Sequence, residues 1–179
     1  MDAKKWLRST KLYSENTIAI DKEITPLNNV TFKEKLNKLS FFSVSDEKSS
    51  ISKIIKQTPS PYYLIDFWAT WCAPCIQGVE AMAKAGLPKN VKVISLSVDK
   101  AKDKEKWKTK TKELEQSISY WLNEELDETK AFLKFIEMQS IPRYILIDEN
   151  MNLIDQAFYH PQQPQFLPKL QNIRNHKYW

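Results

Sequence analysis

The longest apolar stretches of the chain predict two β-strands that are buried on both faces of a sheet. YYLIDFW (62–68) is apolar except for Asp66, and VKVISLSV (91–98) is nearly as apolar. Runs of this length are typical of strands in a sheet that helices cover on both sides. IPRYILID (141–148) and MNLIDQAFY (151–159) predict two further strands, which the short turn between them makes antiparallel neighbours.

Segments with helical patterns alternate with these strands. The expected helices are 49–57, 73–87, 100–115, 127–138 and 161–176. A short apolar segment, 117–122, lies between the third and the fourth of them. Strands that alternate with helices pair in parallel, whereas two strands joined by a tight turn are antiparallel. The order therefore predicts an α/β fold with a mixed central sheet and helices on both faces.

Length and composition indicate one folded domain with peripheral additions. The chain has 179 residues, enough for one domain with a substantial core and too few for two ordinary domains. Its 42% hydrophobic and 27% charged residues are typical of a globular protein. Residues 1–40 carry few patterns, so we expect an N-terminal extension or linker there and a domain over 41–179. With only two glycines, a glycine-rich phosphate-binding loop is not expected.

The charge of the chain does not point to a nucleic-acid partner. Twenty-seven Lys and Arg residues give a net charge of +5, but they are interleaved with Asp and Glu, as in KDKEKWKTKTKELE (102–115). Such interleaving is typical of a solvated helix face. No basic cluster carries the aromatic residues that stack on bases. At most, the charge favours a mild affinity for acidic partners.

The apolar runs also bear on the location of the protein. None approaches the ~20 residues that are needed to span a bilayer, and the opening MDAKKWLRSTKLY lacks the apolar core of a secretory signal. We expect either a cytosolic protein or the mature or truncated soluble part of an exported one. The second case is compatible with a membrane anchor outside this chain.

The only two cysteines, Cys72 and Cys75, lie within DFWATWCAPC (66–75). Cys72 falls where a buried strand gives way to a helix, and the free N–H groups at a helix N-terminus stabilise a thiolate. Cys75 lies one helical turn further on the same face, at a separation that a disulfide can bridge. Pro74 suits the first turn of a helix and stiffens the loop. This pattern indicates a nucleophilic cysteine with a second thiol in reach.

Two other uses of the cysteine pair fit the sequence less well. A static structural disulfide across so short a loop constrains the unfolded chain little. A zinc site needs four ligands, and His160 and His176 have neither a second CxxC motif nor a ligand-spaced partner. We therefore expect no metal and no dissociable cofactor.

DFWATWCAPC resembles the active-site signature of the thioredoxin superfamily, and SIPRYILID resembles its cis-proline loop with the strand that follows. The likeness covers roughly residues 40–175. FWATWC, the inserted segment at about 101–138 and the ending IPRYILIDENMNLI most resemble the TlpA/ResA-type thiol-disulfide oxidoreductases. The resemblance implies a thioredoxin-like fold with an inserted helical segment and an N-terminal extension. It also implies an extracytoplasmic location, in a bacterial periplasm or cell envelope, and partners such as apocytochromes.

The resemblance implies a role for each matching residue. Cys72 corresponds to the attacking cysteine and Cys75 to the resolving one. Pro142 corresponds to the cis-proline beside the disulfide, and Ile141 presents its backbone to an extended substrate. The residues expected to bind substrate are Trp71, Ala73, Pro74, Ile141 and Arg143.

Asp66 matches the buried aspartate of cytosolic thioredoxins, at a position where the TlpA/ResA branch often has Asn. We expect it to lie beneath Cys75 with a raised pKa, because a carboxylate between Ile65 and Phe67 loses its hydration. It would then accept the Cys75 proton as the resolving attack begins. The alternative is that Asp66 is a strand-end residue that caps a neighbouring backbone group.

Two further positions near the motif need comment. The branch often has an acidic residue three positions after the second cysteine, but this chain has Gly78 there, and its nearest acid is Glu80. The role of that acid is therefore not transferred to this chain. Trp68 could belong to the active-site surface or to the core, and we favour the core.

These observations favour a thiol-disulfide oxidoreductase. The Cys72 thiolate would attack a disulfide in a partner protein, and Cys75 would resolve the mixed disulfide. The expected partners are proteins with disulfides or thiols and an upstream thiol-disulfide electron donor. Two alternatives are a thioredoxin-like module that binds cysteine-containing peptides without turnover and a peroxiredoxin. A peroxiredoxin is disfavoured because its Pro- and Thr-bearing cysteine loop is missing from the sequence.

Overall fold

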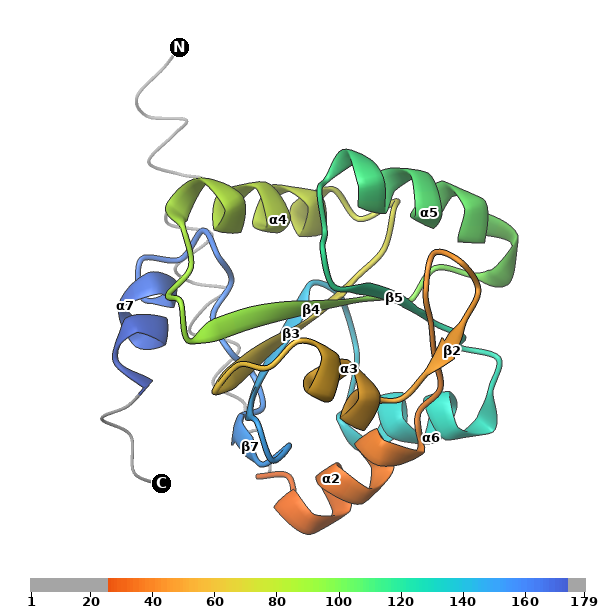
Figure 1. Cartoon of the computed structure of the whole chain (residues 1–179), viewed down its shortest axis with the longest axis horizontal. Coiled ribbons are helices and arrows are strands. Elements are labelled where there is room, and N and C mark those ends of the chain that lie inside the picture. Colours follow the sequence, from red (N-terminus) through yellow and green to blue (C-terminus); the bar gives the residue numbers. More distant parts are fainter. Residues whose placement is uncertain (1–25, 174–179) are drawn as a thin grey trace.

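The described part of the chain, residues 26–173 of a computed structural model, contains one mixed sheet of seven strands (Figure 1). The strands are β1 (Phe41–Phe42), β2 (Lys48–Ser49), β3 (Tyr62–Trp68), β4 (Val91–Ser97), β5 (Ser119–Leu122), β6 (Arg143–Asp148) and β7 (Leu153–Asp155). Their spatial order is β2-β1-β5-β4-β3-β6-β7. β3 pairs in parallel with β4 and antiparallel with β6, while β4 and β5 are parallel. The predicted α/β fold with a mixed sheet is confirmed.

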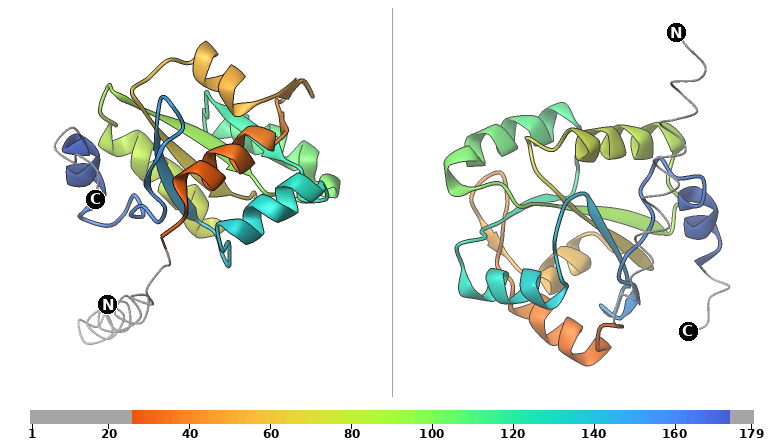
Figure 2. Two further views of the ribbon diagram at one scale, coloured as in Figure 1. Left: turned by 90° about the horizontal axis from the view of Figure 1, so that it is seen from below. Right: turned by 180° about the vertical axis from the view of Figure 1, so that it is seen from behind.

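Helices cover both faces of this sheet. They are α2 (Asn29–Lys38), α3 (Ile51–Gln57), α4 (Ala73–Ala85), α5 (Lys104–Glu113), α6 (Asp127–Phe135) and α7 (Phe166–Gln171), with a 3₁₀ turn at Ala101–Asp103. α4 and α5 lie on one face, and α2, α3 and α6 lie on the other, as the views of Figures 1 and 2 show. α7 packs beside the α4 face through Phe166 and Leu170.

The side-chain alternation of β3 separates two cores. Ile65 and Phe67 belong to the larger core beneath α2, α3 and α6. Leu64 and Trp68 belong to the clusters beneath α4 and α5. Because side chains alternate along a strand, Asp66 lies on the same face as Leu64 and Trp68, under α4.

The N-terminal segment that the sequence sets apart as an extension contains α2. Its apolar side chains Phe32 and Leu36 are fully buried in the larger core. Asn28 begins the helix, because its side chain accepts a hydrogen bond from the Thr31 N–H group at 3.0 Å. Residues 1–25 of the expected extension lie outside the described residues.

Several elements differ from the predicted ranges. The strands β1 and β2 have two residues each, too short to give a periodic pattern. The predicted strand 151–159 is shortened to β7, because the Asp155 carboxylate accepts a hydrogen bond from the Ala157 N–H group and turns the chain. The predicted helix 161–176 is reduced to α7, and its last residues lie outside the described part.

Within residues 26–173, no helix combines the length and the apolar character that crossing a membrane requires.

Candidate functional site

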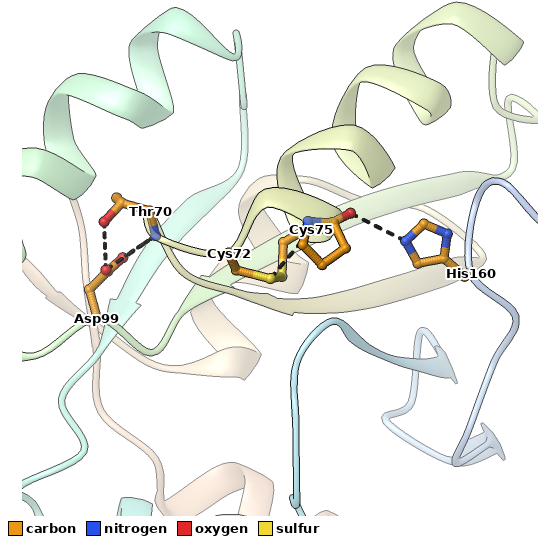
Figure 3. Close-up of a disulfide and its surroundings, with 6 residues drawn as sticks. Thr70, Cys72, Cys75, Asp99 and His160 are labelled. Atoms are coloured by element: carbon orange, nitrogen blue, oxygen red, sulfur yellow. Dashed lines mark hydrogen bonds between the residues drawn. A yellow bond between two sulfur atoms is a disulfide. The ribbon is translucent and has the colours of Figure 1, made fainter. Parts of the chain in front are cut away.

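The two cysteines lie at the junction between β3 and α4. Cys72 is the N-cap of α4, and its sulfur accepts a hydrogen bond from the Cys75 N–H group at 3.3 Å. The two residues form a disulfide with an S–S distance of 2.01 Å and a Cα–Cα distance of 5.3 Å (Figure 3). Cys72 retains 4% exposure, whereas Cys75 is fully buried. The less buried of the two cysteines is therefore the one at the helix N-terminus.

Aromatic side chains surround the disulfide. Trp68, Trp107 and Trp121 pack with the cysteines in one buried cluster. Trp68 is fully buried, which confirms its assignment to the core. Trp71, by contrast, is 68% exposed beside the cysteines. Tryptophans from β3, α5 and β5 thus bury the disulfide, while the loop presents Trp71 to solvent.

The bond between Ile141 and Pro142 is cis, as predicted. It immediately precedes β6, whose first residue pairs with Phe67 near the end of β3. Ile141 is partly buried and packs against the tryptophan and cysteine cluster. The two sequence motifs therefore meet at one end of the sheet.

The remaining predicted substrate-binding residues occupy different surroundings. Ala73 and Pro74 are exposed in the first turn of α4. Arg143 pairs with Phe67, so its side chain lies on the sheet face opposite α4. Burial lowers the pKa of Arg143, with Asp155 and Glu137 acting in the opposite direction.

Asp66 is fully buried, and neither carboxylate oxygen has a hydrogen-bond partner among the described residues. It therefore caps no described backbone group, contrary to the alternative reading of the sequence. Burial raises the pKa of Asp66 to about 8, because a low-dielectric site disfavours the charged form. At neutral pH the carboxyl is therefore mostly protonated.

A second buried aspartate, which the sequence did not reveal as important, holds the loop before Cys72. The Asp99 carboxylate accepts hydrogen bonds from the Thr70 N–H group at 3.0 Å, the Thr70 hydroxyl at 2.7 Å and the Ser97 hydroxyl at 2.7 Å. Its backbone carbonyl accepts a bond from Trp121 Nε1 at 2.7 Å. Figure 3 shows Asp99 and Thr70 on the side of the disulfide away from His160. A polar residue just beyond a buried strand was the only signal for it in the sequence.

His160, considered above only as a metal ligand, lies at the other side of the disulfide. Its Nδ1 accepts a hydrogen bond from the Gln162 N–H group at 3.2 Å, so the proton of the neutral ring lies on Nε2. Nε2 then donates to the Pro74 carbonyl at 3.3 Å (Figure 3). Burial lowers the pKa of His160. The loop after β7 is thereby tied to the first turn of α4.

Trp71 also forms one wall of a cleft of about 770 Å³ against α5. The cleft is lined by Thr70, Trp71, Lys102, Asp103, Glu105, Lys106, Thr109, Lys110 and Glu113. Lys106 bridges Asp103 at 2.6 Å, and Lys110 bridges Glu113. An apolar ring bordered by paired charges is a surface that a partner protein can contact.

Within the described part of the chain, no group of three His, Cys, Asp or Glu residues could hold a metal ion. His176 lies outside that part.

A family model described as thioredoxin-like matches residues 60–153, more than half of the chain. No curated protein shows a significant match.

Solved structures from Bacteroides share the fold. A candidate thiol-disulfide oxidoreductase from Bacteroides vulgatus is 24% identical with a TM-score of 0.60, over 76% of this chain and 86% of that one. A thiol:disulfide interchange protein from Bacteroides sp. is 18% identical with a TM-score of 0.61, over 78% and 87%. A thiol-disulfide oxidoreductase from Bacteroides fragilis is 22% identical with a TM-score of 0.56, over 75% and 95%.

Proposed function

This chain belongs to the thioredoxin-like family, and from that premise we propose that it is a protein-disulfide oxidoreductase that acts through Cys72 and Cys75. The membership agrees with the resemblance that the two sequence motifs carry. One observation carries the proposal: a cysteine pair at a helix N-terminus, with Cys72 at the N-cap and Cys75 fully buried behind it. Free N–H groups at this position stabilise a thiolate on Cys72.

The roles of the two cysteines follow from their positions, because Cys72 is the less buried residue and lies at the N-cap of α4. With the pair reduced, the Cys72 thiolate attacks one sulfur of a partner disulfide and releases the other as a thiolate. Cys75 loses its proton and attacks Cys72, which releases the second partner sulfur. The partner gains two electrons, and this protein ends with the Cys72–Cys75 disulfide. The reverse sequence oxidises a partner dithiol, and the relative reduction potentials decide the direction.

Asp66 supplies the base for the resolving step. Its carboxylate takes the proton of the Cys75 thiol as that sulfur attacks, and it holds the proton in the oxidised state. A pKa of about 8 fits this role, because the carboxyl is then mostly protonated at neutral pH once the disulfide has formed. When a donor reduces the disulfide, the proton returns to Cys75.

The partners are proteins with accessible disulfides or thiols, and an upstream dithiol protein supplies electrons. Exposed Trp71, the first turn of α4 and the backbone at Ile141 form the contact surface. Arg143, which directly follows Pro142, is assigned to this surface from the sequence motif. An extracytoplasmic location, in a cell envelope, is part of the proposal and rests on the resemblance to TlpA/ResA-type proteins.

Trapping of mixed disulfides tests the proposal. In the Cys75→Ser variant, Cys72 can still attack, but nothing resolves the product. We expect partner adducts that dithiothreitol releases, visible on non-reducing gels of the native host. Cys72→Ser is the matched control and should form none. Equal adducts with both variants would contradict the assigned roles.

Turnover distinguishes an enzyme from a module that only binds cysteine-containing peptides. The wild-type protein should accelerate the reduction of insulin by dithiothreitol, and Cys72→Ser should not. A wild-type rate equal to buffer alone would favour the binding module.

A further inference from the structure

The Tyr144 hydroxyl is a buried polar group that the reaction above does not use. Tyr144 is 2% exposed, and its oxygen has no hydrogen-bond partner among the described residues. In the register of β3 and β6, Tyr144 lies directly opposite Asp66. Paired residues of antiparallel strands project from the same face, so both side chains lie under α4. Two neighbouring buried side chains beneath the active-site helix therefore each carry an unsatisfied polar group.

Electrostatics couple the two groups. Burial raises the pKa of the Tyr144 hydroxyl, and the charge of Asp66 raises it further. A tyrosine that keeps its proton is a hydrogen-bond donor, and an ionised carboxylate is an acceptor. A carboxylate that receives such a bond ionises at a lower pH than one without it.

Gly78 gives the hydroxyl its space. A Cβ atom at this position would stand 2.5 Å from the Tyr144 oxygen and 3.3 Å from Nε2 of His160. Any other residue at position 78 would displace the hydroxyl. This is the position at which the resembled branch often has an acidic residue. Here the position is glycine, and the hydroxyl of Tyr144 on β6 reaches the helix instead.

His160 packs against Tyr144. Its ring meets that of Tyr144 edge to face, with 5.7 Å between centroids, and its Nε2 donates to the Pro74 carbonyl. The Phe158 N–H group donates to the Tyr144 carbonyl at 2.9 Å and fixes the loop that carries the histidine. The hydroxyl thus lies against Gly78, away from solvent.

We propose that Tyr144 is a positioning residue that sets the ionisation of Asp66: its hydroxyl donates a hydrogen bond toward the carboxylate when Asp66 has released its proton to Cys75. The bond is made directly or across one bridging water. It stabilises the ionised Asp66 that must be present before Cys75 can be deprotonated. The inference rests on the proposed function for its catalytic consequence, whereas the link between Tyr144 and Asp66 can be measured without any turnover.

The test is a carbon NMR titration of the Asp66 carboxyl in the oxidised wild type and in Tyr144→Phe. We expect the midpoint to rise by about one pH unit in the variant, because it lacks the donor to the charged form. An unchanged midpoint would overturn the proposal. Asp66 lies opposite Tyr144 on β6 and Ser95 on β4, and the ring of His160 contacts that of Tyr144. Cys75 of α4 is held in the disulfide of the oxidised protein and does not titrate there. His160 is followed in the same samples, so that its own titration is not taken for that of Asp66.

Two further variants separate an effect of the Tyr144 hydroxyl from a general loss of stability. Gly78→Ala should reproduce the shift, because its Cβ would displace the hydroxyl. Tyr63→Phe is the matched control: Tyr63 is fully buried on β3, but its side chain lies on the opposite face and accepts from the Ser60 N–H group at 2.8 Å. The Tyr63→Phe variant should lower the free energy of unfolding and leave the midpoint of the Asp66 titration unchanged. A shift of equal size in Tyr63→Phe would contradict the proposal.

Kinetics then connect the inference to the reaction. Tyr144→Phe should slow resolution of the mixed disulfide about tenfold at pH 7 and approach the wild-type rate at high pH, where Asp66 is ionised in both proteins. A slowing that is equal at every pH would contradict the assigned role. If the wild type shows no turnover, the proposed function fails, and the titration still decides the link between Tyr144 and Asp66.

Discussion

Two fully buried aspartates flank the active-site loop, and their surroundings differ. Asp99 receives hydrogen bonds from the Thr70 N–H group and from the hydroxyls of Thr70 and Ser97. Asp66 receives none from the described residues, and burial raises its pKa to about 8. One carboxyl is saturated with donors, and the other is left unsatisfied under α4.

Under the proposed function, the difference separates a carboxyl that holds the loop from one that transfers a proton. The bonds to Asp99 hold the backbone and side chain of Thr70 and thereby fix the loop that ends at Cys72. An unsatisfied carboxyl costs stability, because its polar atoms lose water without gaining partners. In return, Asp66 has a pKa at which it can exchange a proton near neutral pH. Substitutions at the two sites should therefore change stability in opposite directions.

The largest expected effect is at Asp66. A carboxyl whose pKa lies near 8 in the folded protein resists ionisation, so its cost is absent below its unfolded pKa near 4 and grows as pH rises toward 8. Asn keeps the shape of the side chain and cannot ionise. In urea unfolding at pH 8, we expect oxidised Asp66→Asn to be about 3 to 5 kcal/mol more stable than the wild type.

The pH dependence provides the control for this prediction. The advantage of Asp66→Asn should shrink on acidification and vanish near pH 4, while resolution of the mixed disulfide slows at neutral pH. A variant that is less stable than the wild type at pH 8 would show that Asp66 makes favourable contacts after all. An unchanged rate of resolution would leave Cys75 without its assigned base.

At Asp99, substitution is expected to lower the free energy of unfolding. Asp99→Ala leaves a buried N–H group and two hydroxyls without their acceptor, which should destabilise the protein by about 3 kcal/mol. The loss should appear in the same urea titrations and lower the rate of insulin reduction, because the loop before Cys72 is no longer held. Asp99→Asn, which keeps one acceptor oxygen, should lie between the wild type and Asp99→Ala. If Asp99→Ala were as stable as the wild type, the network would have no structural role.

The sequence predicted the parts of this site that depend on local order. The strand 62–68 is observed with those bounds, and the helix after it begins at Ala73 as predicted. Continuous apolar runs and a proline in the first turn of a helix are local signals, so they predict these elements without knowledge of the tertiary structure. The cis bond at Pro142 was predicted from the resemblance, because its motif is also local.

Residues whose role depends on distant partners could not be found in this way. The Asp99 carboxylate, just after β4, accepts hydrogen bonds from Thr70, which follows β3 and is 29 residues away in the sequence. Tyr144 lies close to Gly78 only because β6 pairs with β3 under α4. The short strand β5 exists because it pairs with β4 on one side and β1 on the other. None of these contacts leaves a periodic pattern in the sequence.

The smallest effect is expected at Thr70, where one side-chain bond is removed while the backbone bond to Asp99 remains. Thr70→Val keeps the branched shape and deletes the hydroxyl that donates to Asp99 at 2.7 Å. A hydrogen bond to a carboxylate contributes about 1 to 3 kcal/mol, so we expect a loss near the lower end of that range. Thr70→Ser keeps the hydroxyl and should recover most of it. The double variant Thr70→Val with Asp99→Ala then isolates the bond: once the acceptor is gone, the second substitution should cost much less than it does alone. If Thr70→Val lowered the free energy of unfolding equally in the wild type and in Asp99→Ala, Thr70 would act through packing. The hydrogen bonds that distinguish Asp99 from Asp66 would then be those from the Ser97 hydroxyl and the Thr70 N–H group alone.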